Sequence, residues 1–127
     1  MSKLKFYHCE HCGHISIDRA ERKLGLKCCG ADMQLLNPNT VDASNEKHLP
    51  VVDVNGSSVK VSVGSVTHPM GEDHWIQLVC LETTNGYQIK YLNPGEAPEA
   101  CFELCSGEKE VAAYEYCNLH GLWITKL

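Results

Sequence analysis

Four of the eight cysteines in this 127-residue chain lie in two pairs near the N-terminus, within CEHCGH at 9–14 and KCCGAD at 27–32. Residues 1–36 have few apolar runs of strand length, and a segment below about 40 residues usually needs disulfides, a metal or a partner chain to fold. The N-terminal residues show no apolar signal-peptide core, so we expect free thiols or metal thiolates in a reducing compartment. A bound metal is therefore expected to stabilise this segment.

The two pairs differ in form. The first, Cys-x-x-Cys-Gly at 9–13, has the form of a metal knuckle in which a tight turn aims two thiolates at one point. In the second pair, Cys28 and Cys29 are adjacent, which should distort a tetrahedral site. Four thiolates suit Zn²⁺ or a single iron ion, and the spacing leaves both metals open. Three nearby histidines are expected to be exposed turn residues rather than ligands: His8, His11 and His14.

From Val51 onward the sequence alternates between apolar and polar residues, as β-strands do. Asn-Gly pairs at 55–56 and 85–86 predict type I′ hairpin turns, and the first is followed by three valines on one strand face, at 59, 61 and 63. HWIQLVCLE, APEACFELC, EVAAYEYC and GLWITKL read as further strands. We expect six or seven antiparallel strands in a β-sandwich, a polar linker at 37–45 and no helix longer than a turn or two.

The β segment and its approach contain a second group of metal-binding side chains. EKHLP, THPMGEDH and CNLHGLW contribute four imidazoles and one thiol, mostly at expected strand ends and loops: His48, His68, His74, His120 and Cys117. Structural zinc is nearly always satisfied by four ligands, so five favour iron, which accepts a further ligand. Neutral imidazoles and one thiolate leave ferrous iron with a net charge near plus one, which favours an anionic diatomic guest.

The ordered motifs CEHCG, CCG, EKHLP, HPMGEDHWI and CNLHGLW resemble those of desulfoferrodoxin, the two-iron form of superoxide reductase, over nearly the whole chain. The resemblance implies a mainly β protein of two domains. Residues 1–37 would form a small desulforedoxin-like domain with an Fe(Cys)₄ centre. Residues 38–127 would form an immunoglobulin-like antiparallel β-sandwich with an Fe(His)₄Cys centre.

Matched position by position, the resemblance also implies a role for each site residue. The first iron would take four thiolates: Cys9, Cys12, Cys28 and Cys29. The second would take four equatorial histidines, His48, His68, His74 and His120, with Cys117 as the axial thiolate. Glu46 matches a carboxylate that can occupy the sixth position in the ferric form, and Lys47 matches the cation beside the open face. The implied reaction is the one-electron reduction of superoxide to hydrogen peroxide without release of dioxygen.

Charge and hydropathy restrict the partners. The net charge of −5 argues against a nucleic-acid surface, and no segment approaches the roughly 18 apolar residues of a membrane span. We expect a cytoplasmic protein that detoxifies superoxide. The resemblance implies a homodimer, and a rubredoxin-like protein or a flavin reductase as electron donor. The first iron would relay electrons or hold the small domain and the dimer together.

Two other functions account for part of the pattern. A zinc-ribbon and β-sandwich interaction module explains the first four cysteines but not the histidine motifs, and a pure electron carrier leaves the open coordination position unused. Cys80, Cys101 and Cys105 match no ligand motif and are expected to be small, buried apolar side chains. Glu72 and Asp73, beside His74, are expected to be surface or outer-shell groups.

Overall fold

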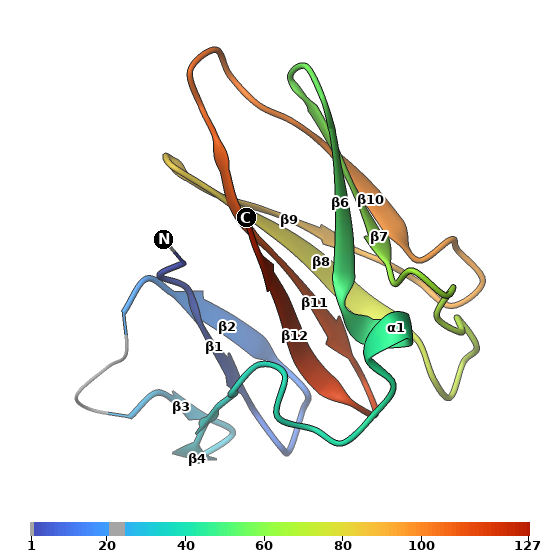
Figure 1. Cartoon of the computed structure of the whole chain (residues 1–127). Coiled ribbons are helices and arrows are strands. Elements are labelled where there is room, and N and C mark those ends of the chain that lie inside the picture. Colours follow the sequence, from blue (N-terminus) through green and yellow to red (C-terminus); the bar gives the residue numbers. More distant parts are fainter. Residues whose placement is uncertain (1, 21–24) are drawn as a thin grey trace. The chain divides into compact units, whose positions relative to one another are not determined.

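The computed structural model describes residues 2–20 and 25–127 (Figure 1). They form two compact units, Ser2–Asn37 and Pro38–Leu127. Nearly all of the regular structure is β-strand, as the sequence predicts. No helix in the described ranges is long and apolar enough to cross a membrane.

The first unit contains a three-stranded sheet and a short hairpin. The sheet has the order β2-β1-β5, from the strands β1 (Lys5–His8), β2 (Ile15–Asp18) and β5 (Gln34–Leu35). The hairpin pairs β3 (Lys27–Cys28) with β4 (Ala31–Asp32). The buried apolar cluster within this unit is small and is centred on Tyr7, Cys9 and Met33. One of its members is thus a predicted metal ligand.

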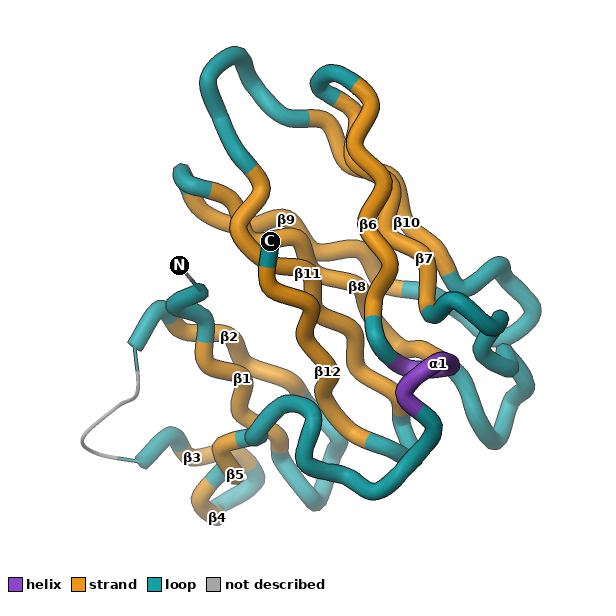
Figure 2. Tube along the Cα trace, in the orientation of Figure 1, coloured by secondary structure: helices purple, strands orange, loops and turns teal. Residues whose placement is uncertain are grey.

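The second unit is a sandwich of two antiparallel sheets (Figure 2). One sheet has the order β10-β7-β6, from β6 (Pro50–Asn55), β7 (Ser58–Val63) and β10 (Glu99–Glu103). The other has the order β12-β11-β8-β9, from β8 (Ile76–Thr83), β9 (Gly86–Tyr91), β11 (Glu110–Cys117) and β12 (Gly121–Lys126). The only helix in the described residues is the single turn α1 (Asn45–His48). The predicted β-sandwich is confirmed.

The core of the sandwich lies between these two sheets. Val59, Val61 and Val63 are at most 1% exposed, which confirms that alternate residues of β7 point inward. Across from them pack residues of β8 and β11, including Cys117, which is fully buried. The core thus extends up to the predicted thiolate ligand and forms a rigid frame for it.

The two hairpin turns form at the predicted places, but one residue away from the predicted register. In the first, Asn55 pairs with Ser58, so the turn residues are 56 and 57, and only Gly56 has a positive φ, of 64°. In the second, Thr83 pairs with Gly86 around residues 84 and 85, and neither of these has a positive φ. The type I′ prediction is wrong for both turns, because that turn needs positive φ at both central residues.

The three cysteines outside the ligand motifs divide into two environments. Cys80 is fully buried in β8, as predicted. Cys101 and Cys105 are exposed, so the prediction that they are buried is wrong. β10 lies at the edge of its sheet and alternates, so that Ala100 and Phe102 point into the core and Cys101 points outward.

Candidate metal centres

The first candidate centre brings together the four N-terminal cysteines. Their sulfur atoms all lie within 4.8 Å of one another: Cys9, Cys12, Cys28 and Cys29. The Sγ atoms of Cys12 and Cys28 are 3.6 Å apart, and those of the adjacent Cys28 and Cys29 are 4.0 Å apart. One ion can therefore contact all four sulfurs.

Left-handed backbone conformations explain how the adjacent pair converges. Gly13 has a φ of 80° after the first knuckle, and the Cys9 N–H donates to the His14 carbonyl to close that turn. In the second pair Cys29 itself has a φ of 54°, followed by Gly30 at 74°. A positive φ is uncommon for a residue with a Cβ. The distortion expected for this pair is thus taken up by the backbone of Cys29.

The environment of the sulfurs shifts the pKa values of three of the four thiols. Backbone N–H groups of Cys12 and His11 lower the pKa of Cys9 to about 6. Contact with the sulfurs of Cys12 and Cys9 raises the pKa of Cys28 to about 12 and also raises that of Cys29. Sulfur atoms this close cannot all be thiolates unless a cation lies among them. The donor set therefore fits a tetrahedral metal with thiolate ligands.

The second candidate centre is a closed ring of four imidazoles. Successive ring centroids are 4.6 to 5.0 Å apart in the order His48, His68, His74, His120 and back to His48. Each ring stands at 76 to 87° to its neighbours. One nitrogen from each ring and the Sγ of Cys117 lie within 4.8 Å of one another.

Backbone carbonyls select which nitrogen of two rings faces the centre. His48 Nδ1 lies 2.7 Å from the carbonyl of Ser44, and His68 Nδ1 lies 2.6 Å from that of Pro69. A carbonyl only accepts, so both Nδ1 atoms carry the proton and both Nε2 atoms carry a lone pair. These two Nε2 atoms lie 3.1 Å apart, with no proton between them. A cation at the centre would remove this repulsion.

The other two rings are held through the chain around them. His74 Nε2 is buried and has no hydrogen-bond partner in the described residues. The side chain of Asn118 holds both flanks of this histidine: its Oδ1 accepts from Trp75 N–H at 2.9 Å, and its Nδ2 donates to the Asp73 carbonyl at 2.9 Å. A buried nitrogen with no hydrogen-bond partner, on a ring that lies among other possible ligands, fits a metal ligand.

His120 faces the centre through Nδ1 rather than Nε2. That atom lies 3.1 Å from His48 Nε2 and 3.9 Å from Cys117 Sγ. Trp123 supports both rings, because its indole N–H donates to the His120 carbonyl at 3.0 Å and its ring stacks on His48 with centroids 4.9 Å apart. Trp123 and Asn118 were not predicted as site residues, since their roles depend on which loops meet in space.

Burial favours the neutral form of three of these histidines. It lowers the pKa of His68 to about 4, and it also lowers the pKa values of His48 and His74. Burial raises the pKa of Cys117, while the backbone N–H groups of Leu119 and His120 act in the opposite direction. Neutral imidazoles bind metals, and the same N–H groups would stabilise a thiolate.

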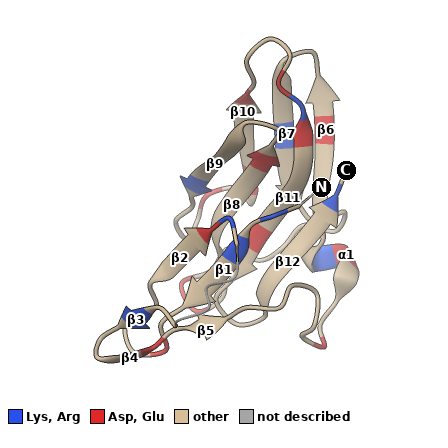
Figure 3. Cartoon of the chain, turned by 90° about the vertical axis from the view of Figure 1, so that its left-hand side faces the viewer, with Lys and Arg blue, Asp and Glu red and all other residues tan. Residues whose placement is uncertain are grey.

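Glu46 and Lys47 are exposed residues of α1, directly before the buried His48. Figure 3 shows acidic and basic residues side by side on this turn. Burial is the largest cause that lowers the pKa values of His48 and His74, and the Lys47 charge is the smallest cause that acts in this direction. Hydrogen bonding to its own backbone N–H is the largest cause that lowers the pKa of Glu46, and the Lys47 charge acts in the same direction as the smallest cause.

The remaining polar residues near these motifs lie outside both ligand groups. Glu72 and Asp73 are exposed, and so are His11 and His14, as predicted. The prediction that His8 is an exposed turn residue is wrong, because it is half-buried at the end of strand β1. None of them joins a metal-binding group within residues 2–20 and 25–127.

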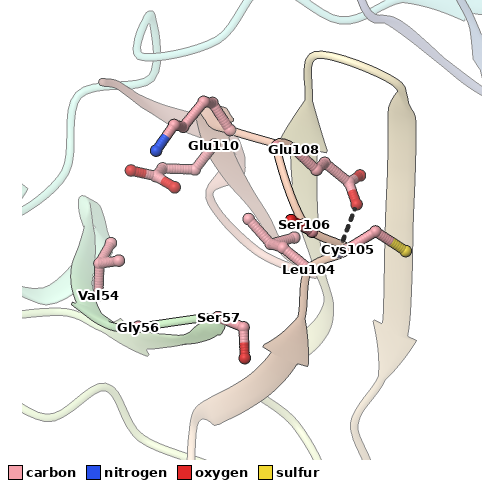
Figure 4. A pocket seen from close by; sticks show the side chains of 10 residues that line it. Val54, Gly56, Ser57, Leu104, Cys105, Ser106, Glu108 and Glu110 are labelled. Atoms are coloured by element: carbon pink, nitrogen blue, oxygen red, sulfur yellow. Dashed lines mark hydrogen bonds between the residues drawn. The ribbon is translucent and has the colours of Figure 1, made fainter.

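A pocket of about 230 Å³ lies elsewhere on the sandwich, between the β6–β7 turn and the loop after β10 (Figure 4). Leu104, Glu108 and Glu110 are among the residues that line it. It contains none of the nine predicted ligands, and the sulfur of Cys105 points away from it.

Comparison with known proteins agrees with this geometry. The family model described as Desulfoferrodoxin matches residues 40–126. A desulfoferrodoxin of Syntrophotalea carbinolica is 49% identical over 122 residues, which cover 95% of this chain and 94% of the relative. The chain belongs to the desulfoferrodoxin family. The Cys₄ and His₄Cys groups fit the two iron sites of a desulfoferrodoxin.

Solved structures extend this desulfoferrodoxin comparison to the fold. The crystal structure of the superoxide reductase from Treponema pallidum is 42% identical and has a TM-score of 0.85, covering 97% of this chain and 98% of that one. A one-iron superoxide reductase from Giardia intestinalis is 33% identical with a TM-score of 0.56, and covers 65% of this chain and 97% of its own.

Proposed function

We propose that this desulfoferrodoxin is a superoxide reductase whose reaction takes place at the His₄Cys group. The observation that carries the proposal is the closed ring of four imidazoles with a buried thiol beside it. Five protein ligands leave room on an octahedral iron for a sixth ligand from solvent. Bound ferrous iron would supply the electron that reduces superoxide to hydrogen peroxide, with two protons taken from water.

The protein side chains divide the remaining tasks. The carbonyls of Ser44 and Pro69 hold two imidazoles with their lone pairs inward. The Lys47 ammonium attracts an anionic substrate, which a protein of net charge −5 would otherwise repel. The Glu46 carboxylate, one residue away, would occupy the position vacated by product after oxidation.

The same proposal assigns the rest of the chain. Residues 1–37 form the desulforedoxin-like domain and residues 38–127 the reductase domain. The Cys₄ iron relays electrons from a rubredoxin-like protein or a flavin reductase, or holds the small domain and the dimer together. The protein acts as a cytoplasmic homodimer that detoxifies superoxide.

The stoichiometry of superoxide consumption tests the activity. The reduced, iron-loaded protein should give one hydrogen peroxide for each superoxide and no dioxygen after pulse radiolysis. Iron analysis should find two irons in each chain, with a thiolate-to-iron band that appears when the second iron is oxidised. Release of dioxygen would indicate dismutation, and no consumption of superoxide would indicate an electron carrier.

A further inference from the structure

The loop that follows β7 lies directly against the α1 turn. The Val66 N–H donates to the Glu46 carbonyl at 2.8 Å, and the Ser65 hydroxyl donates to the same oxygen at 3.3 Å. Gly64 lies beside this contact. A Cβ at Gly64 would be 2.5 Å from the Glu46 carbonyl oxygen and 2.9 Å from the carbonyl carbon of Lys47.

This contact has no room for a side chain. The atoms that a Cβ would meet all belong to the backbone, so no rotation of a side chain relieves the overlap. The loop or α1 would have to move. Gly71, seven residues further along, has nothing within 4 Å of the same added atom. Of these two glycines, only Gly64 is therefore required by a close backbone contact.

The same loop leads into the metal centre. The His68 N–H donates to the Val63 carbonyl at 3.1 Å, which closes the loop immediately before a ring ligand. On the other side, α1 ends at His48, whose ring is fixed by the Ser44 carbonyl. Between these two fixed histidines, the loop holds the peptide group that joins Glu46 to Lys47.

We propose that Gly64 is a positioning residue for Glu46 and Lys47. By allowing the loop to contact the Glu46 carbonyl, it sets where the carboxylate and the ammonium stand relative to the four-histidine ring. The roles of these two side chains rest on the proposed function, whereas the contact of the loop with the Glu46 carbonyl does not.

The first experiment compares Gly64→Ala with Gly71→Ala in the iron-loaded protein. Gly64→Ala should speed amide hydrogen exchange at Val66 at least about tenfold, because the hydrogen bond to α1 opens. Its rate with superoxide should fall by up to about tenfold, which is the loss expected when the Lys47 charge is removed altogether. Gly71→Ala should leave both quantities unchanged. Ser65→Ala removes only the weaker of the two donors to the Glu46 carbonyl, so it should show the same two effects at smaller size. This variant provides the test if Gly64→Ala does not fold.

A double-mutant cycle separates positioning from general destabilisation. If Gly64 acts through Lys47, adding Gly64→Ala to Lys47→Ile should slow the reaction much less than it slows the unmutated protein. Equal effects in both backgrounds, or unchanged Val66 exchange in Gly64→Ala, would overturn the proposal. An unmutated protein that does not react with superoxide would contradict the proposed function. The exchange rate of the Val66 amide does not depend on superoxide, so it would still test the loop contact.

Discussion

In two of the four imidazoles of the second centre, a single backbone carbonyl decides which ring nitrogen faces inward. His48 and His68 each donate from Nδ1 to a carbonyl within one turn of the chain, Ser44 in one case and Pro69 in the other. Each partner lies at most four residues away, so the orientation of the ring is set locally. The lone pairs are thus directed at the centre before a metal binds.

Cys117 gives the most direct test of the second centre. Because it supplies the only sulfur in the His₄Cys group, Cys117→Ser should abolish the thiolate-to-iron band of that centre. The bands of the Cys₄ centre should remain. The measurement is the visible spectrum of the oxidised protein, with Cys101→Ser as control because Cys101 is exposed and belongs to neither group. A second-centre band that survives in Cys117→Ser would show that the ligand is wrongly assigned.

Lys47 tests electrostatic attraction of the substrate. Lys47→Ile should slow the bimolecular reaction with superoxide about tenfold at low ionic strength, and the difference should shrink as salt is added, because screening acts over about 10 Å at 0.1 M. Pulse radiolysis over a range of salt concentrations measures this. Lys60→Ile makes the same change in net charge at a residue paired with Glu99, so it should have little effect. Equal slowing by both variants would mean that net charge alone matters.

The β11–β12 hairpin is the element that joins the thiolate to an imidazole. Cys117 is paired with Gly121 at the end of the hairpin, so His120 lies in the connecting turn. Within this turn, Asn118 holds the chain on both sides of His74 through hydrogen bonds to Trp75 and Asp73. One hairpin therefore supplies two ligands and supports a third.

Asn118→Ala should loosen the segment around His74. The loss of two hydrogen bonds should lower the free energy of unfolding by about 1 to 2 kcal/mol. Iron should dissociate from the second centre faster than it does in the unmutated protein, because this centre includes His74. Release from the first centre should not change. Urea unfolding and the rate of iron release to a chelator measure the two effects. Asn85→Ala, in an exposed turn, is the control, and equal iron release from both variants would contradict this role.

Turn registers illustrate the limit of local sequence signals. Asn-Gly marks both hairpins correctly, yet the register is set by which strand residues pair, Asn55 with Ser58 and Thr83 with Gly86. Strand pairing depends on the inward-facing valines and on the opposite sheet, which a dipeptide does not report. The exposure of Cys101 also depends on strand pairing, because this residue lies on the outward face of an edge strand.

The two units differ in what stabilises them. The sandwich has a large core contributed by both of its sheets, in which the Cys117 ligand is one member among many, whereas the cluster within Ser2–Asn37 is small and is centred on only three buried residues, one of which is the Cys9 ligand. A fold of this size usually depends on its metal. Metal binding and folding should therefore be coupled in the first unit and largely separate in the second.

Removal of both metals should separate the two units. After anaerobic treatment with a chelator, residues 2–20 and 25–37 should lose hydrogen-exchange protection, while β7, β8 and β11 should keep theirs because nearly all of their core side chains are apolar and bind no metal. Hydrogen exchange with mass spectrometry before and after treatment measures this, and restored iron should restore protection. Simultaneous loss of protection throughout the chain would show that the sandwich also needs its metal.

Much of the protein could be read from the sequence because its signals are local. Alternation of apolar residues indicated the strands, and the spacing of cysteines and histidines indicated two ligand sets, which the structure brings together as Cys₄ and His₄Cys groups. Lys47 and Glu46 were found only by resemblance to a family, since an exposed charge has no local signature. The left-handed Cys29, the Asn118 contacts and the need for glycine at Gly64 were decided by the tertiary structure alone. Each depends on the approach of segments that are distant in the chain or on a backbone angle set by such an approach, which residue spacing does not encode.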